Sequence, residues 1–106
     1  MNKPTVPVIP IELDKQRTLR IDFNALSLVE EKTGKNALSQ ELWENINASN
    51  VSTFLWACLI HEDKQLKLED VRKEIHPGNV REIIKVLNKA NKAHTPESDG
   101  EETEKN

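Results

Sequence analysis

The chain has 106 residues, with 15 Lys and Arg, 18 Asp and Glu, and one cysteine. This length is enough for a single domain with a small core. No stretch reaches the ~18 apolar residues of a membrane-spanning helix, and the first residues lack the apolar run of a secretory signal, so we expect neither membrane insertion nor secretion. Because Cys58 has no second cysteine to pair with and lies in an apolar stretch, we expect a reduced cytoplasmic protein whose thiol packs as a small apolar group.

Charge is unevenly distributed along the chain. Residues 95–106 contain five acidic side chains and one lysine, which gives this segment a net charge of −4, and no apolar side chain follows Pro96. We therefore predict a flexible Pro-rich N-terminus over 1–7, a single domain over 8–94 and a disordered acidic tail over 95–106. The remainder of the chain is nearly neutral and lacks the concentrated positive charge of a typical nucleic-acid-binding protein.

The first expected element is a β-hairpin. Two runs of alternating apolar residues flank a four-residue polar break over 14–17, and alternation with a period of two gives each strand one apolar face. Because an isolated hairpin is only marginally stable in water, this face must pack against the rest of the domain. The alternating residues are Ile9, Ile11 and Leu13, then Leu19, Ile21 and Phe23.

Helices are expected over most of the remaining domain. Asp22 is a good N-cap residue and Gly34 suits the left-handed position after a helix, so a helix is predicted over 23–33. The expected fold class is α+β and mainly α, with an N-terminal β-hairpin, four to five short helices and a disordered acidic tail. Apolar residues at helical spacing predict the further helices over 39–46, 51–62, 68–75 and 79–93.

The helix predicted over 51–62 carries more apolar surface than one buried stripe requires. Eight of the ten residues from 51 to 60 are apolar, and the usual core stripe accounts for only part of them. The other faces carry Trp56 and Ile60, which are either buried within the domain or exposed to a partner chain. Exposed aromatic side chains often dominate protein interfaces. The candidate protein-binding residues are Trp43, Phe54, Trp56, Leu59 and Ile60.

No residue pattern indicates catalysis, a cofactor or a metal. His61 and Glu62 are adjacent in the sequence, not spaced as ligands on one helix face, and we interpret them as a solvated helix end. The three glycines are isolated, so no phosphate-binding loop is indicated. We therefore predict a protein that is not an enzyme and has no catalytic, cofactor-binding or metal-binding residues.

The last predicted helix has a basic stripe. Arg81, Lys85, Lys89 and Lys92 are separated by four, four and three residues, which places them on one helix face. The simplest interpretation is the solvent-facing side of an amphipathic helix, and the alternatives are contact with the acidic tail or with an acidic partner. The stripe contains no aromatic residue, which argues against binding to single-stranded nucleic acid.

Three stretches resemble, in their order and spacing, the tail assembly chaperones of long-tailed bacteriophages, in the short form that lacks a frameshifted extension. The first is RTLRIDFNALSLVEEKTGK over 17–35, and the second is LWACLIHEDKQLKLEDV over 55–71. The third is the final amphipathic helix with the charged tail that follows it. Together they extend over most of residues 8–93.

The resemblance implies a mostly helical protein that acts in the host cytoplasm during tail morphogenesis and is not part of the mature virion. Chaperones of this kind coat the tape measure protein, keep its apolar helices from aggregating and recruit tail tube subunits. The implied partners are the tape measure protein and the tail tube protein. Self-association through the candidate binding residues is a further expectation, whereas membranes and nucleic acids are not expected partners.

Two other functions stay open as alternatives. One is a small nucleic-acid-binding regulatory protein that uses the basic face of the last helix, and its binding would weaken steeply with salt. The other is a structural virion subunit, which mass spectrometry of purified particles would detect.

Overall fold

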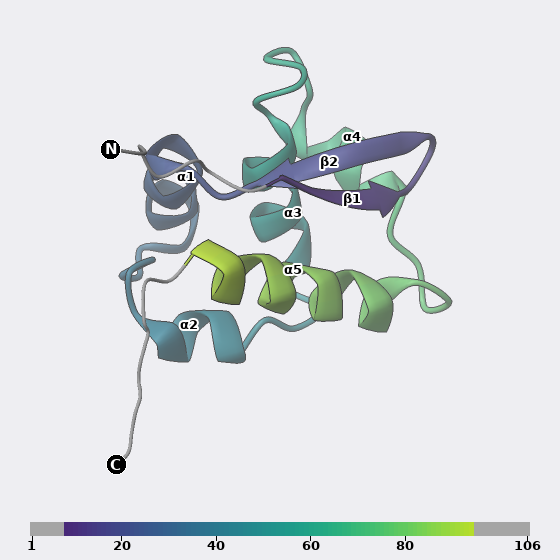
Figure 1. Cartoon of the computed structure of the whole chain (residues 1–106). Coiled ribbons are helices and arrows are strands. Elements are labelled where there is room, and N and C mark those ends of the chain that lie inside the picture. The colour runs from purple at the N-terminus through teal and green to yellow at the C-terminus, as the bar shows by residue number, and fades with distance from the viewer. Residues whose placement is uncertain (1–7, 95–106) are drawn as a thin grey trace.

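The fold is a two-stranded antiparallel hairpin followed by five helices (Figure 1). A computed structural model describes residues 8–94, so the predictions for 1–7 and 95–106 lie outside the described residues. The order of elements confirms the predicted fold class, an α+β and mainly α domain with an N-terminal β-hairpin. No described helix combines the length and the apolar character needed to cross a bilayer.

The hairpin has the predicted apolar face. Strand β1 (Val8–Glu12) pairs with β2 (Gln16–Arg20), and Ile9 lies opposite Leu19. Ile11 and Leu19 are buried, as the alternation predicts. In the turn between the strands, Nε of Arg17 donates to Oδ1 of Asp14 at 2.8 Å. This hydrogen bond favours the ionised carboxylate and lowers the pKa of Asp14.

The outer edge of β2 is closed by the segment that follows the third helix. The backbone N–H and the Oγ1 of Thr18 donate to Oε2 of Glu62, at 3.1 and 2.6 Å. The Thr18 carbonyl accepts from Nε2 of His61 at 2.9 Å, because a carbonyl oxygen cannot donate. The unpaired N–H and C=O groups of a strand edge can pair with another chain, and these contacts satisfy those of Thr18. His61 and Glu62 are therefore not the merely solvated helix end that the sequence indicated.

Helix α1 (Phe23–Thr33) begins and ends where it was predicted to. Oδ1 of Asp22 accepts from the Ala25 N–H at 2.8 Å, which is the N-cap contact. Gly34 adopts the left-handed conformation, with a φ of 71°, and its N–H donates to the Glu30 carbonyl.

The prediction that Phe23 belongs to the apolar face of the hairpin is wrong. The second strand ends at Arg20, and Phe23 occupies the first position of α1 with its side chain exposed.

The later helices lie close to their predicted positions, although the first three of them are shorter than predicted. The third helix ends at Leu59 because the chain then tightens into a turn, in which the Glu62 N–H donates to the Leu59 carbonyl at 3.0 Å. This turn places His61 and Glu62 beside β2. The four helices are α2 (Gln40–Glu44), α3 (Val51–Leu59), α4 (Leu68–Lys73) and α5 (Val80–His94).

Helix α3 lies at the centre of the domain, between the hairpin and α5 (Figure 1). It packs against β2, α1, α4 and α5, and eight of its nine residues are buried. A helix that is apolar on every face needs neighbours on every face, and this arrangement supplies them. The buried residues that surround it on other elements include Leu19, Val29, Trp43, Val71 and Leu87.

The thiol of Cys58 is buried in α3. Burial, together with the nearby negative charge of Asp22, raises the pKa of this thiol to about 12, from 9.0 for a free thiol. Above pH 9 the unfolded chain therefore loses a proton that the folded chain keeps, so ionisation favours the unfolded state. The stability of the fold is unaffected by this group below that pH and falls as the pH rises toward the folded-state pKa.

We therefore predict that the free energy of unfolding falls with pH above 9 more steeply in the wild-type chain than in a Cys58→Ala variant. The expected difference in slope is about 1.4 kcal/mol per pH unit. Urea titrations of both proteins at several pH values above and below 9 measure it. Parallel pH profiles would mean that the thiol is accessible to water in the folded chain.

Candidate protein-binding surfaces

Two of the predicted protein-binding residues form the centre of the core. The rings of Trp43 and Phe54 meet edge to face, with centroids 4.7 Å apart and planes inclined by 67°. Nε1 of Trp43 donates to the Ala37 carbonyl at 2.8 Å, so the polar atom of this buried ring is satisfied within the chain. Both side chains are almost completely shielded from solvent. Their aromatic contact holds α2 against α3.

The other three candidates lie in α3 or at its end. Trp56 is 9% exposed, and its Nε1 donates to the Leu66 carbonyl at 2.9 Å, which fixes the loop before α4. Nζ of Lys32 lies 5.6 Å from the centroid of the Trp56 ring, within the range of a cation–π contact. Leu59 is buried and Ile60 is half-buried. The structure thus brings the five candidates into or against one core, and in this conformation a partner reaches only Ile60 and the rim of Trp56.

The large exposed apolar side chains are elsewhere. Among the described residues, Phe23 is 81% exposed, Leu38 is 74% exposed and Val8 is 52% exposed. Phe23 begins α1, and Leu38 lies in the connection from α1 to α2. The exposure of Phe23 follows from helical periodicity in the sequence, because at 3.6 residues per turn position 23 points away from the buried Ala25 and Val29. Leu38 belongs to an irregular loop, for which periodicity gives no orientation.

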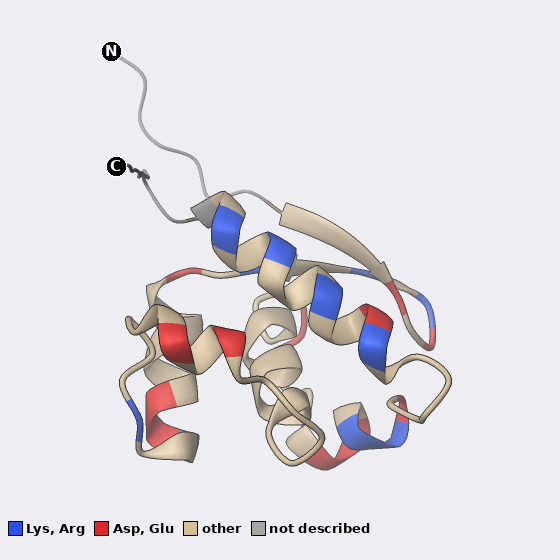
Figure 2. Ribbon diagram, turned by 90° about the horizontal axis from the view of Figure 1, so that it is seen from below, with Lys and Arg blue, Asp and Glu red and all other residues tan. Residues whose placement is uncertain are grey.

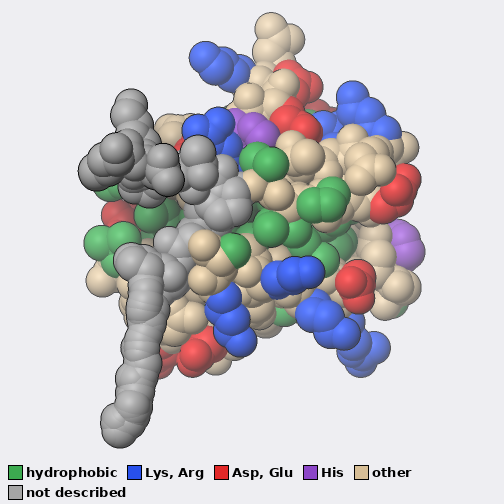
Figure 3. Space-filling view, in the orientation of Figure 1, with side chains coloured by type: hydrophobic (Ala, Val, Ile, Leu, Met, Phe, Trp, Pro, Cys, Tyr) green, Lys and Arg blue, Asp and Glu red, His purple; other side chains and the backbone are tan. Residues whose placement is uncertain are grey.

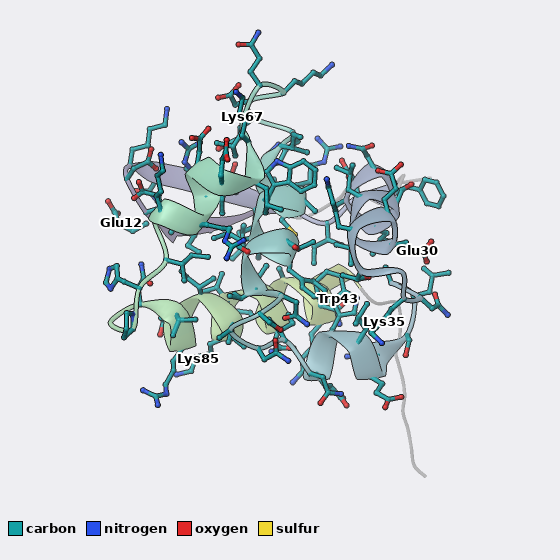
Figure 4. The ribbon with its side chains drawn as sticks, turned by 180° about the vertical axis from the view of Figure 1, so that it is seen from behind. Glu12, Glu30, Lys35, Trp43, Lys67 and Lys85 are labelled. Carbon is teal, nitrogen blue, oxygen red and sulfur yellow. The ribbon has the colours of Figure 1, made fainter. Side chains whose placement is uncertain are left out.

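A pocket of about 390 Å³ lies beside Leu38, where the α1–α2 and α2–α3 connections meet α2. Several of its polar side chains stabilise the surrounding loops: Oδ1 of Asn36 accepts from the Leu38 N–H, and Oδ1 of Asn50 accepts from the Asn47 N–H. Figure 4 labels Lys35 in the α1–α2 connection. Seven of the eight lining residues have polar side chains, and the full set is Lys35, Asn36, Ser39, Glu41, Leu42, Asn45, Asn47 and Asn50.

Exposed residues of like charge are concentrated on particular helices. The predicted basic stripe lies exposed along α5, whereas exposed carboxylates gather on α1 and α2 (Figure 2). On the face that carries β1 and α5, hydrophobic side chains lie next to the lysine and arginine side chains of the stripe (Figure 3). We call Arg81, Lys85, Lys89 and Lys92 the basic face of α5. The exposed acidic residues of α1 and α2 are Glu30, Glu31, Glu41 and Glu44.

The described surface thus carries exposed apolar side chains at Phe23 and Leu38, a pocket beside Leu38 and the basic face of α5. In the part of the chain that the structure describes, no three His, Cys, Asp or Glu side chains are arranged to hold a metal ion. Comparisons with protein-family profiles, with curated protein sequences and with solved structures found no match.

Proposed function

We propose that this chain is a tail assembly chaperone of a long-tailed bacteriophage, which binds the tape measure protein and recruits tail tube subunits during tail morphogenesis. Its support from the sequence is the order and spacing of the three stretches over 17–35, 55–71 and the final helix. A hairpin that continues directly into α1, followed by short helices, is compatible with the mostly helical protein that this resemblance implies.

The observation that carries the protein-binding role is the exposure of Phe23 at the start of α1 and of Leu38 in the connection that follows α1. Neither side chain contributes to the core, and burial of each against a client would contribute about 1.5–3 kcal/mol. In this proposal, these two side chains are the apolar anchors for a helix of the tape measure protein. This is the helix-in-groove mode of recognition, in which a few apolar anchors provide the affinity.

The polar pocket beside Leu38 complements this surface. Lys35 and Glu41 contribute opposite charges to its lining, and Leu42 is the apolar residue of the lining. A client helix whose apolar side covers Leu38 would direct polar side chains of its edge toward this pocket. The candidate client surface therefore comprises Phe23, Leu38 and the residues that line this pocket.

The test is co-expression with the tape measure protein encoded by the same phage. We expect the chaperone to raise the soluble fraction of the client several-fold, and the double substitution Phe23→Ser with Leu38→Ser to remove most of this gain. Both side chains are exposed, so the variant should stay folded. The matched control is Val8→Ser, which replaces an exposed apolar residue on β1. A client that is equally insoluble with and without the chain would refute the chaperone role.

The second candidate function is nucleic-acid binding, favoured by the exposure of the whole basic face of α5. Four phosphate contacts would make the logarithm of the binding constant fall with the logarithm of the salt concentration with a slope of about −3 to −4. A mobility-shift assay over a salt series separates this function from chaperone activity. Binding to DNA or RNA that persists at physiological salt, without any effect on the client, would favour the regulator.

A further inference from the structure

The basic face of α5 is a continuous row of positive charge. Its four side chains are exposed, and successive members are three or four residues apart (Figure 2). With a rise of 1.5 Å per residue, the row extends over about 16 Å of the helix. Such a row is long enough to contact several anionic groups of one extended ligand.

These cations repel one another and have few local partners. Arg81 and Lys85, and likewise Lys85 and Lys89, are four residues apart, where like charges destabilise a helix. Glu82 is the acidic residue of α5. The ion pairs among the described residues join Arg17 to Asp14 and Arg20 to Asp22, both away from this helix. An anion that binds along the row would relieve the repulsion.

The sequence places a suitable anion next to this helix. Acidic residues begin at Glu97, three positions after α5 ends at His94. In an extended chain, Glu97, Asp99 and Glu101 point to one side and follow each other at about 6.6 Å. Residues four apart on a helix follow each other at about 6 Å, so the two spacings match. The segment 97–104 extends over about 23 Å, which is sufficient to follow the row back toward Arg81.

We propose that the acidic segment 97–104 binds along the basic face of α5 in the same chain, antiparallel to the helix, and thereby competes with nucleic acid and other polyanions for this face. The short covalent connection favours this intramolecular contact, because it gives the segment an effective concentration of roughly millimolar. The contact is electrostatic and exposed, so it loosens with salt. The inference does not depend on the chaperone role, since Phe23 and Leu38 lie on another part of the domain.

The first experiment compares backbone amide signals of the intact chain by two-dimensional NMR. The tail variant carries Glu97→Gln, Asp99→Asn and Glu101→Gln, and the control carries Glu31→Gln, Glu41→Gln and Glu44→Gln, which changes the net charge equally. We expect signals of residues 81–92 to shift in the tail variant and on addition of salt to the wild type. Unchanged signals over 81–92 would overturn the proposal. Shifts that vanish on tenfold dilution would overturn it as well, because the ligand would then be the tail of a second copy.

The second experiment measures competition, with a short DNA duplex as the polyanion probe at low salt. We expect the tail variant to bind the duplex about tenfold more tightly than the wild type, because the intramolecular competitor is weakened. The affinity of the control variant for the duplex should differ from that of the wild type by less than about twofold. The charges that it loses lie on α1 and α2, away from the basic face, and are screened by solvent. Equal gains in both variants would show a general charge effect and would reject the specific contact.

Discussion

A Phe54→Ala variant is expected to lose about 3–5 kcal/mol of its free energy of unfolding. Phe54 is fully buried in α3, and its ring meets that of Trp43 at a centroid distance of 4.7 Å. Alanine would leave a cavity at the point where α2 joins the core. Because small domains have a total stability of about 5–15 kcal/mol, this loss would bring the variant close to unfolding. A urea titration followed by tryptophan fluorescence measures the change.

The chain provides a matched control for this prediction. Phe23→Ala removes the same atoms from a side chain that is 81% exposed, and it should change the free energy of unfolding by less than about 0.5 kcal/mol. The comparison cancels any difference in the intrinsic helix preference of the two residue types, since both positions are helical. Similar losses in the two variants would contradict the assignment of Phe54 to the core and Phe23 to the surface.

Trp56→Ala is the second substitution with a large expected effect, again about 3–5 kcal/mol. The indole is largely buried, anchors the loop before α4 through the Leu66 carbonyl and lies beneath the Lys32 ammonium group. Its removal loosens α3, α4 and α1 together. The free energy of unfolding from urea titration gives the size of the loss, and client binding should fall only in proportion to the unfolded fraction.

A Trp56→Phe variant separates packing from hydrogen bonding. Phenylalanine keeps most of the apolar contact but leaves the Leu66 carbonyl without its donor, and we expect a loss of about 1–3 kcal/mol. If Trp56 contacted a partner through its rim, both variants would bind the partner less well under conditions where both are folded. Full binding by folded Trp56→Phe, with reduced stability alone, would identify this residue as a structural one.

Local signals in the sequence determine several features of this fold. Helix α1 has both an aspartate N-cap and a left-handed glycine at its end, so its bounds were predictable to the residue. The strands of the hairpin follow from their alternation around a polar turn, although the second strand is shorter than the alternation suggested. The central position of α3 follows from its composition, because such an apolar helix is stable only where neighbours surround it.

Features that depend on distant parts of the chain were not predictable in this way. Whether Trp56 is buried depends on Leu66 and Lys32, which come from other elements. The closure of the β2 edge depends on the tight turn after α3, which directs Glu62 to Thr18, 44 residues earlier in the sequence. The client surface was expected on α3, whereas the exposed apolar residues Phe23 and Leu38 belong to the start of a helix and to a loop. Helical periodicity places Phe23 away from the core, but it gives no orientation for Leu38, which belongs to a loop.

The central position of α3 has a consequence for the order of folding during synthesis. This helix is contributed by the middle of the chain, and it contacts β2 and α1 from the preceding half and α4 and α5 from the following half. Neither half can therefore complete a hydrophobic core by itself, because each lacks the layer that covers the other side of α3. On the ribosome, the hairpin and α1 should remain unprotected against proteolysis until α5 has emerged. Folding of the domain is then a single late event, which takes place after nearly the whole domain has emerged from the ribosome.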